Sequence, residues 1–258
     1  MVTLDLGNSR LKLRRWRVRS GGAPELAGAA TFPAGPELVA QAVAELERAA
    51  EPAVLALSSV AAPAVEDALV AALDLRFGAR FVARPSAPIE LAVRFPERVG
   101  RDRVFAALGA WSRLGASALV VDAGTCVTVD ALAAAASAPR FLGGAIAPGP
   151  ALLAAALASG GARLTAVEPR PGVPALGRDT EEALRSGIVV GLRGAVRELI
   201  TEIGREAGLE TAPLVWTGGA LPLLCEPALF PERRNHVEPE LVHLGLLAAL
   251  GHPAPAVP

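Results

Sequence analysis

Residues that could bind phosphate gather in one short stretch near the beginning of the chain, DLGNSRLK at positions 5–12. An apolar run ends at Asp5, a Gly-Asn-Ser turn follows, and a second strand-like run carries Lys12. Glycine lets backbone N–H groups point at an anion, hydroxyl and amide groups can bind phosphate oxygen, and a carboxylate can hold a cation. Lys12 is the only lysine among 25 basic residues, which favours a specific role for its compact ammonium over a place on a solvated strand.

The same opening occurs again in the second half of the chain, where DAGT at 122–125 lies between an apolar run and another strand-like run. One hairpin of this kind is ordinary turn chemistry, since Asp, Gly and Asn are common turn residues. Two hairpins in corresponding positions favour a phosphate site, and they indicate two related α/β halves with a ligand cleft between them. The chain contains no G-x-x-x-x-G-K-[ST] motif, so the site is not a P-loop.

A third polar motif, GRDR at 100–103, begins a segment with helical periodicity. Two interpretations remain open from the residues alone. The motif can be an ion-paired helix start, or Asp102 can act as a general base while Arg103 holds an anionic substrate. Glycine-rich turns at 143–149 and 217–220 follow apolar runs, and they indicate either close backbone crossings or contact with a nucleotide.

The elements that must position these motifs alternate between strand-like and helical patterns. Strands are expected over 2–6, 11–18, 53–60, 118–132 (a strand pair), 141–149 and 213–220 with its glycine turn. Helices are expected over 36–50, 63–73, 101–115, 150–159, 179–208 and 239–251, with a disordered tail after them. The long helix has Asp179 or Thr180 as its N-cap and Glu182 near the capping-box position.

The bulk composition argues against several classes of protein. The net charge is −1 and 52% of the residues are apolar, so a large core is possible and a dedicated nucleic-acid or membrane-surface binder is not indicated. The two cysteines, Cys126 and Cys225, have no metal-ligand spacing. No signal peptide and no apolar run long enough to span a membrane is recognised, and a cytoplasmic protein is expected.

Together the motifs resemble the ordered set of type III pantothenate kinases. The set is DLGNSRLK (5–12), GRDR (100–103), DAGTCVTVD (122–130), GGAIAPG (143–149), the DT of GRDT (179–180) and TGGA (217–220). The resemblance implies the α/β fold of the acetate kinase, sugar kinase, Hsp70 and actin superfamily. Two ribonuclease-H-like (actin-like ATPase) domains, expected at 1–115 and 116–258, would then surround a nucleotide cleft.

The resemblance also implies an activity, its cofactors and its assembly. The reaction is the ATP-dependent phosphorylation of pantothenate to 4′-phosphopantothenate, the first step of coenzyme A biosynthesis. The enzyme would be a cytoplasmic homodimer that needs Mg²⁺ and a monovalent cation, K⁺ or NH₄⁺.

Site roles follow from the resemblance position by position. Asp102 matches the catalytic base, and Asp122 matches the ligand of the monovalent cation. ATP contacts are implied for Asp5, Leu6, Gly7, Asn8, Ser9, Arg10, Leu11, Lys12, Thr125, Gly218 and Gly219. Pantothenate contacts are implied for Val93, Gly100, Arg101, Asp102, Arg103 and Thr180.

Two positions depart from the family pattern. Val93 stands where many members carry an aromatic residue that lines the substrate pocket, and Cys126 stands where alanine is usual. The alternatives are a non-catalytic ATP-binding regulator, similar to an accessory transcription factor, and a different kinase or a polyphosphate phosphatase of the same superfamily. The presence of Asp5, Asp102, Asp122 and Thr180 disfavours the regulator, while GRDR and the short chain disfavour the other enzymes.

Overall fold

The computed structural model describes residues 1–19, 22–48, 52–135, 138–161, 164–225 and 230–252. The strands are β1 (Val2–Leu6), β2 (Arg10–Arg17), β3 (Glu25–Pro33), β4 (Leu55–Ser59), β5 (Phe81–Val82), β6 (Glu90–Leu91), β7 (Ala118–Ala123), β8 (Cys126–Ala133), β9 (Arg140–Pro148), β10 (Leu214–Thr217) and β11 (Asn235–Val237). The helices are α1 (Leu38–Glu47), α2 (Pro63–Phe77), α3 (Arg101–Leu114), α4 (Pro150–Gly160), α5 (Thr180–Ala207), α6 (Leu221–Leu224) and α7 (Leu241–Ala249). The expected disordered tail is 252–258. His252 is described, and its N–H donates to the Leu247 carbonyl at 2.9 Å, whereas residues 253–258 lie outside the described residues. None of the helices in the described ranges is both long enough and apolar enough to cross a membrane.

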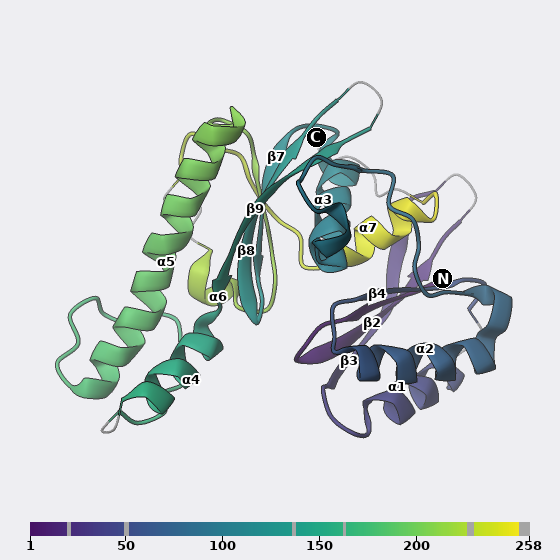
Figure 1. Cartoon of the computed structure of the whole chain (residues 1–258), viewed down its shortest axis with the longest axis horizontal. Helices are drawn as coiled ribbons and strands as arrows, with labels where there is room; N and C mark the ends of the chain where they lie inside the picture. The colour runs from purple at the N-terminus through teal and green to yellow at the C-terminus, as the bar shows by residue number, and fades with distance from the viewer. Residues whose placement is uncertain (20–21, 49–51, 136–137, 162–163, 226–229, 253–258) are drawn as a thin grey trace.

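The first sheet has the strand order β3-β2-β1-β4-β5. Its central strand, β1, pairs antiparallel with β2 and parallel with β4. Successive side chains of a strand point to opposite faces, so Leu4 and Leu6 enter a core with α1 and α2 while Thr3 and Asp5 point to the other face. Helix α7 packs against that other face of β1 (Figure 1), so the polar residues of β1 turn toward the second half of the chain.

The second sheet has the order β11-β10-β7-β8-β9-β6. Helix α5 covers one face of this sheet, and α3 and α7 cover the other. Because α3 also contacts β4 and α7 also contacts β1, these two helices lie between the sheets (Figure 1). A Cβ at Gly109 would overlap the carbonyl of Leu241, and one at Gly245 would overlap that of Phe105, so α3 and α7 cross with their backbones in contact.

The two sheets repeat one arrangement. Each contains an antiparallel hairpin, β1–β2 or β7–β8, with an antiparallel third strand, β3 or β9, beside it. On the other side of the hairpin each has two parallel strands, β4 and β5 or β10 and β11. This confirms the internal repeat predicted from Asp5 and Asp122. Strand β6 joins the second sheet and α7 returns to the first, and the expected division after residue 115 stays a prediction.

Most elements predicted from periodicity are present with bounds within a few residues, whereas β3, β5, β6, β11 and α6 are not predicted by the pattern. Strand β3 lies at an edge of its sheet, and its residues are exposed or half-buried, so its alternation of apolar and polar residues is weak. The other four elements have two to four residues each, too few to show a period.

Candidate active site

The hairpin β1–β2 places a carboxylate beside the single lysine. Asp5 and Lys12 are directly paired across the two strands, and Lys12 Nζ lies 3.3 Å from Asp5 Oδ2. Asp5 is 7% exposed. The turn that follows is closed by a hydrogen bond from the Gly7 N–H to the Arg10 carbonyl, 3.0 Å long, and it leaves Asn8 exposed.

The hairpin β7–β8 places Asp122 at the corresponding point of the second sheet. Its turn is closed by a hydrogen bond from the Gly124 N–H to the Cys126 carbonyl, 3.0 Å long. Burial raises the pKa of Asp122 to about 7, and the Lys12 ammonium of the first hairpin opposes this shift. Three further carboxylates add to the shift, those of Asp5, Asp102 and Asp130. Charges from both halves of the chain therefore act on Asp122.

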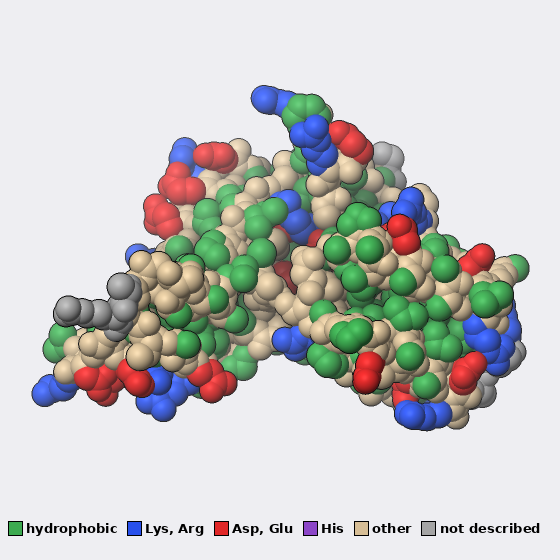
Figure 2. Space-filling view, turned by 60° about the horizontal axis from the view of Figure 1, so that its bottom comes forward, with side chains coloured by type: hydrophobic (Ala, Val, Ile, Leu, Met, Phe, Trp, Pro, Cys, Tyr) green, Lys and Arg blue, Asp and Glu red, His purple; other side chains and the backbone are tan. Residues whose placement is uncertain are grey.

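The two hairpin turns meet. The Ser9 hydroxyl lies 2.8 Å from the Thr125 hydroxyl, and either can donate. The glycine turn after β10 lies beside them: a Cβ at Gly218 would lie 2.5 Å from Asp122 Oδ1, and one at Gly219 would lie 3.8 Å from an Arg10 guanidinium nitrogen. The space-filling view shows a hollow between the two halves in which acidic and basic side chains gather (Figure 2).

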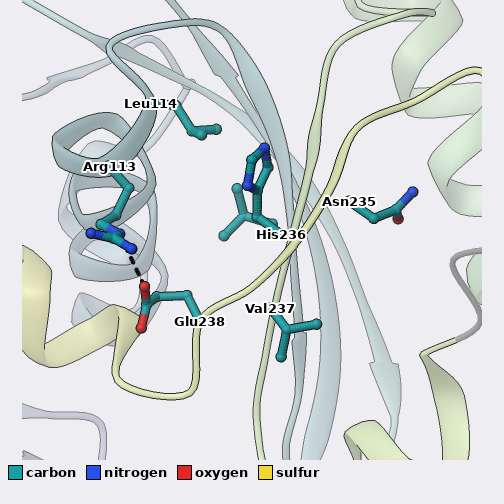
Figure 3. Close-up of a pocket in the computed structure, with 7 residues that line it drawn as sticks. Arg113, Leu114, Asn235, His236, Val237 and Glu238 are labelled. Carbon is teal, nitrogen blue, oxygen red and sulfur yellow. Dashed lines mark ion pairs between the residues drawn. The ribbon is translucent and has the colours of Figure 1, made fainter. Parts of the chain in front are cut away.

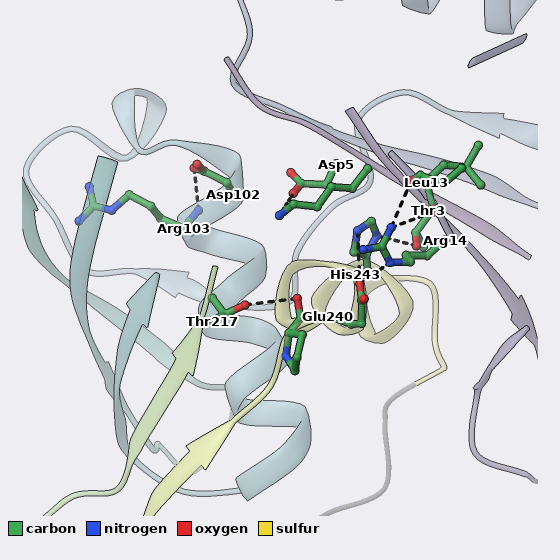
Figure 4. Close-up of polar contacts among 12 residues, drawn as sticks. Thr3, Asp5, Leu13, Arg14, Asp102, Arg103, Thr217, Glu240 and His243 are labelled. Atoms are coloured by element: carbon green, nitrogen blue, oxygen red, sulfur yellow. Dashed lines mark hydrogen bonds and ion pairs between the residues drawn. The ribbon is translucent and has the colours of Figure 1, made fainter. Parts of the chain in front are cut away.

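Asp102 approaches the same place from the beginning of α3. Its Oδ1 accepts a hydrogen bond from the Arg103 N–H, 2.8 Å long, which holds the carboxylate at the helix start. Gly100 makes room for it, because a Cβ there would lie 2.6 Å from Asp102 Oδ1. Burial raises the pKa of Asp102, and the charge of Asp5 adds to this shift. Figure 4 shows Asp5 and Asp102 on facing sides of the space between β1 and α3.

Arg103 has a partner that the sequence reasoning assigned no role. Its Nε lies 3.1 and 3.2 Å from the two carboxylate oxygens of Asp130 on β8, and its Nη2 also donates to Asp130. Burial raises the pKa of Asp130 to about 6, with Arg103 opposing the shift. One signal could have drawn attention to Asp130: it is the only charged residue in the strand CVTVDALA.

Several predicted site residues have side chains that are engaged within the protein. Leu6 and Leu11 are buried in the core of the first sheet, so only their backbone could contact a nucleotide. The Arg101 guanidinium donates to the Pro85 carbonyl at 2.7 Å and lies over the ring of Phe105, and burial lowers its pKa.

Val93 packs against the core between the sheets. One of its methyl groups lies 3.5 Å from where a Cβ at Gly143 would be, which places Val93 near β9.

Thr180, a predicted pantothenate contact, lies away from α3 and the two hairpins (Figure 1). It is exposed at the beginning of α5, and no described hydrogen bond joins it to α3 or to either hairpin. In Figure 1 this end of α5 lies beyond α4, away from α3. The predicted cap is confirmed: Asp179 is the N-cap and accepts a hydrogen bond from the Glu182 N–H, while Glu182 accepts one from the Arg178 N–H.

A separate pocket of about 240 Å³ lies at the other end of α3 from Asp102 (Figure 3). It is lined by Arg113, Leu114, Val215, Asn235, His236, Val237 and Glu238. Arg113 and Glu238 form an ion pair 3.0 Å long across it. None of the predicted site residues lines this pocket, so it is distinct from the hollow between the hairpins.

The comparison with known protein families decides the membership of the chain. The sequence model of type III pantothenate kinases matches residues 1–202. The chain belongs to the type III pantothenate kinase family. Curated type III pantothenate kinases share 36% identity over 156 residues (Akkermansia muciniphila), 40% over 161 residues (Thermomicrobium roseum) and 37% over 195 residues (Rhodopirellula baltica). These alignments cover 60%, 62% and 71% of this chain and 62%, 60% and 67% of the respective relative.

Solved structures that resemble this type III pantothenate kinase family member establish its fold. A Campylobacter jejuni protein described as a Baf family transcriptional activator matches with a TM-score of 0.59 at 18% identity, over 97% of this chain and 98% of that one. A protein described as a 2-dehydro-3-deoxygalactonokinase from Sinorhizobium meliloti matches with a TM-score of 0.52 at 17% identity, over 96% and 95% of the two chains. The predicted two-part actin-like ATPase fold is confirmed.

Proposed function

We propose that this chain transfers a phosphoryl group from ATP to the alcohol of pantothenate, which gives 4′-phosphopantothenate in the first step of coenzyme A biosynthesis. The observation that carries the proposal is the convergence of Asp5, Asp102 and Asp122 with Lys12, from both halves of the chain, beside two turns that touch each other. Membership of the type III pantothenate kinase family supports the identity of the acceptor. The reaction agrees with a cytoplasmic location.

The two hairpins supply what a polyphosphate needs. Backbone N–H groups of the turns, the hydroxyls of Ser9 and Thr125 and the ammonium of Lys12 can bind phosphate oxygens. The glycine turn at Gly218 and Gly219 lies against Asp122 and Arg10, where it can contact the rest of the nucleotide. Phosphoryl transfer depends chiefly on alignment and on neutralising charge, which is what these groups provide.

Asp102 is placed to act as the base. Because burial raises its pKa, the carboxylate accepts a proton from the acceptor hydroxyl more readily than an exposed aspartate would. Its neighbour in the chain, Arg103, offers a cation for the anionic end of pantothenate. The two residues together can hold both functional ends of the acceptor.

The residues also fit the expected cations. Mg²⁺ binds to proteins through one or two carboxylates together with substrate phosphates and water. Within the described ranges no group of three or more His, Cys, Asp or Glu residues could hold a metal ion, which agrees with a Mg²⁺ carried mainly by ATP. A monovalent cation at Asp122 would offset the repulsion among the neighbouring carboxylates, and the bound cations would neutralise charge on the phosphates.

The activity is tested by incubating the purified protein with ATP, Mg²⁺ and pantothenate, with and without K⁺, and by following phosphopantothenate by mass spectrometry. We expect K⁺-dependent product, and a fall of roughly a hundredfold or more in kcat for Asp102→Asn. Asp67→Asn is the matched control, because Asp67 is exposed on α2. If ATP binds but no product forms with any cation, the kinase assignment is wrong and a non-catalytic regulator takes its place.

The expected homodimer is part of the proposal. Within one chain Thr180 lies apart from Asp102, so contact of both residues with one pantothenate requires a second copy. A mixture of Asp102→Asn and Thr180→Ala proteins should then recover activity that neither variant has alone, because mixed dimers contain one intact site. No recovery on mixing would mean that each site is built from a single chain.

A further inference from the structure

The Asp130 carboxylate is buried in the second sheet and faces one cation. Its side chain is 1% exposed, and it accepts hydrogen bonds from both Nε and Nη2 of Arg103. The neighbouring strand β9 leaves room for this carboxylate. Gly144 is opposite Asp130 on β9, and a Cβ there would lie 2.5 Å from Asp130 Oδ1. A side chain at position 144 would therefore displace the carboxylate.

The Arg103 guanidinium is fixed on a second side as well. It lies over the ring of Phe141, with 5.4 Å between the guanidinium carbon and the ring centroid. Asp130 takes the edge formed by Nε and Nη2, while Nη1 donates to none of the residues that the structure describes. The side chain is 14% exposed. One edge of a rigidly held guanidinium is thus left for a ligand.

That ligand would be an anion close to the base. Arg103 follows Asp102 in the first turn of α3, and Arg103 donates its backbone N–H to the Asp102 carboxylate. Buried ion pairs are weak contributors to stability, because the desolvation of two charges offsets their attraction. The Asp130–Arg103 pair is therefore better explained by what it does for Arg103 than by what it adds to the fold.

We propose that Asp130 is a positioning residue for the acceptor substrate: it holds Arg103 so that the free Nη1 edge binds the carboxylate of the acceptor while the acceptor hydroxyl lies at Asp102. This inference rests on the proposed function and adds a consequence for selectivity. An acceptor with a carboxylate gains from the fixed guanidinium, whereas a neutral amide of the same acceptor does not. Loss of Asp130 should therefore weaken the binding of the carboxylate-bearing acceptor and leave the binding of the neutral amide unchanged.

Steady-state kinetics of Asp130→Asn test this directly, with pantothenate, a neutral pantothenate amide and ATP varied in turn. We expect the KM for pantothenate to rise roughly tenfold or more, as for other buried charge pairs that lose one partner. The KM for ATP and the KM for the amide should change by less than about twofold, because the free Nη1 edge contacts neither molecule. The kcat at saturating pantothenate should change as little, because only binding of the acceptor carboxylate depends on that edge. Glu90→Gln is the matched control, since it removes a carboxylate that pairs with Arg140 at 3.0 Å on the outer part of the same sheet.

A second variant and a second measurement keep the outcomes distinct. If Asp130→Asn does not fold, Phe141→Leu removes the other support of Arg103 and should raise the KM for pantothenate in the same selective way. Calorimetric binding of pantothenate, in the presence of a non-hydrolysable ATP analogue, reports the same effect without turnover.

An active wild type whose KM for pantothenate is unchanged by both variants overturns this inference and leaves the proposed function intact. Equal losses toward pantothenate, the amide and ATP would also overturn it, because they indicate a merely structural role. A wild type that neither turns over nor binds pantothenate overturns the proposed function and this inference with it.

Discussion

The Ser9 hydroxyl lies 2.8 Å from the Thr125 hydroxyl, although 116 residues separate them in the chain. The two residues occupy corresponding places in the turns of two hairpins that belong to different sheets. Their contact shows that the internal repeat is folded face to face, with both turns at the same end of the hollow. If the hollow binds a polyphosphate, each half of the chain offers it one of these two hydroxyls.

Ser9→Ala should weaken ATP binding more than it lowers the stability of the fold. A hydrogen bond to a charged group contributes about 1.5–3 kcal/mol, so we expect the KM for ATP to rise roughly tenfold or more. Because the contact is exposed, the free energy of unfolding should change by less than about 0.5 kcal/mol. Thr125→Ser keeps the second hydroxyl and should behave as wild type. An unchanged KM for ATP together with a lower melting temperature would mean that the contact only ties the halves together.

Gly218→Ala should disturb the site through the backbone. Gly218 has a φ of 102°, and an added Cβ would lie 2.5 Å from Asp122 Oδ1 and overlap the carbonyl of Ala123. We expect a loss of about 1–3 kcal/mol of unfolding free energy, measured by thermal or urea unfolding, together with weaker nucleotide binding. Gly219→Ala is the matched control for the unfolding free energy, because its Cβ would meet only an Arg10 guanidinium nitrogen, at 3.8 Å. Equal effects of the two substitutions would contradict the steric argument.

The single lysine should not be replaceable by glutamine. Lys12 holds its ammonium 3.3 Å from Asp5 and also acts on the charge of Asp122. Lys12→Gln should lower kcat/KM for ATP at least about tenfold, because it removes the ammonium that acts on both carboxylates. Lys12→Arg should keep only part of the wild-type kcat/KM for ATP, since a planar guanidinium differs in shape from an ammonium. Full activity in Lys12→Gln would show that Lys12 is a solvated strand residue after all.

A buried histidine joins α7 to the first sheet. His243 is 1% exposed, and its Nδ1 lies 2.8 Å from the Thr3 hydroxyl of β1, while its Nε2 lies 3.8 Å from a carboxylate oxygen of Glu240 (Figure 4). Glu240 in turn accepts a hydrogen bond from Arg14 Nε at 2.6 Å. Burial lowers the pKa of His243 well below 6.5, and the charges of Arg14 and Lys12 add to this shift.

This histidine should make the fold less stable in mild acid. Below about pH 6.5 the unfolded chain binds a proton at position 243 that the folded chain does not, so the unfolding free energy falls as pH falls, by up to about 1.4 kcal/mol per pH unit. Urea unfolding of wild type and His243→Gln at pH 7.5, 6 and 5 measures the effect. We expect the stability of wild type relative to the variant to decrease toward pH 5. A constant difference between the two proteins would mean that His243 is protonated in the folded state as well.

The elements predicted correctly from the sequence are those with a local cause. Alternation of apolar residues marks β1 and β2, and the Asp179 cap with Glu182 marks the beginning of α5. Edge strand β3 and the short β5, β6 and β11 carry no such signal, because the pairing that forms them comes from strands far away in the chain. Asp5, Asp102 and Asp122 could be selected from their motifs. That their carboxylates lie close enough to repel one another could not be predicted from those motifs.

By itself the sequence determined which residues end strands, which begin helices and that one hairpin is used twice, because turn chemistry, capping and side-chain alternation act over a few residues. Only the tertiary structure decided that Ser9 meets Thr125, that Asp130 holds Arg103 and that Thr180 stands apart from Asp102. These relationships depend on how α3 and α7 pack between the two sheets, which is the joint result of many contacts between distant residues. The distances and the shifted pKa values of the site follow from that packing.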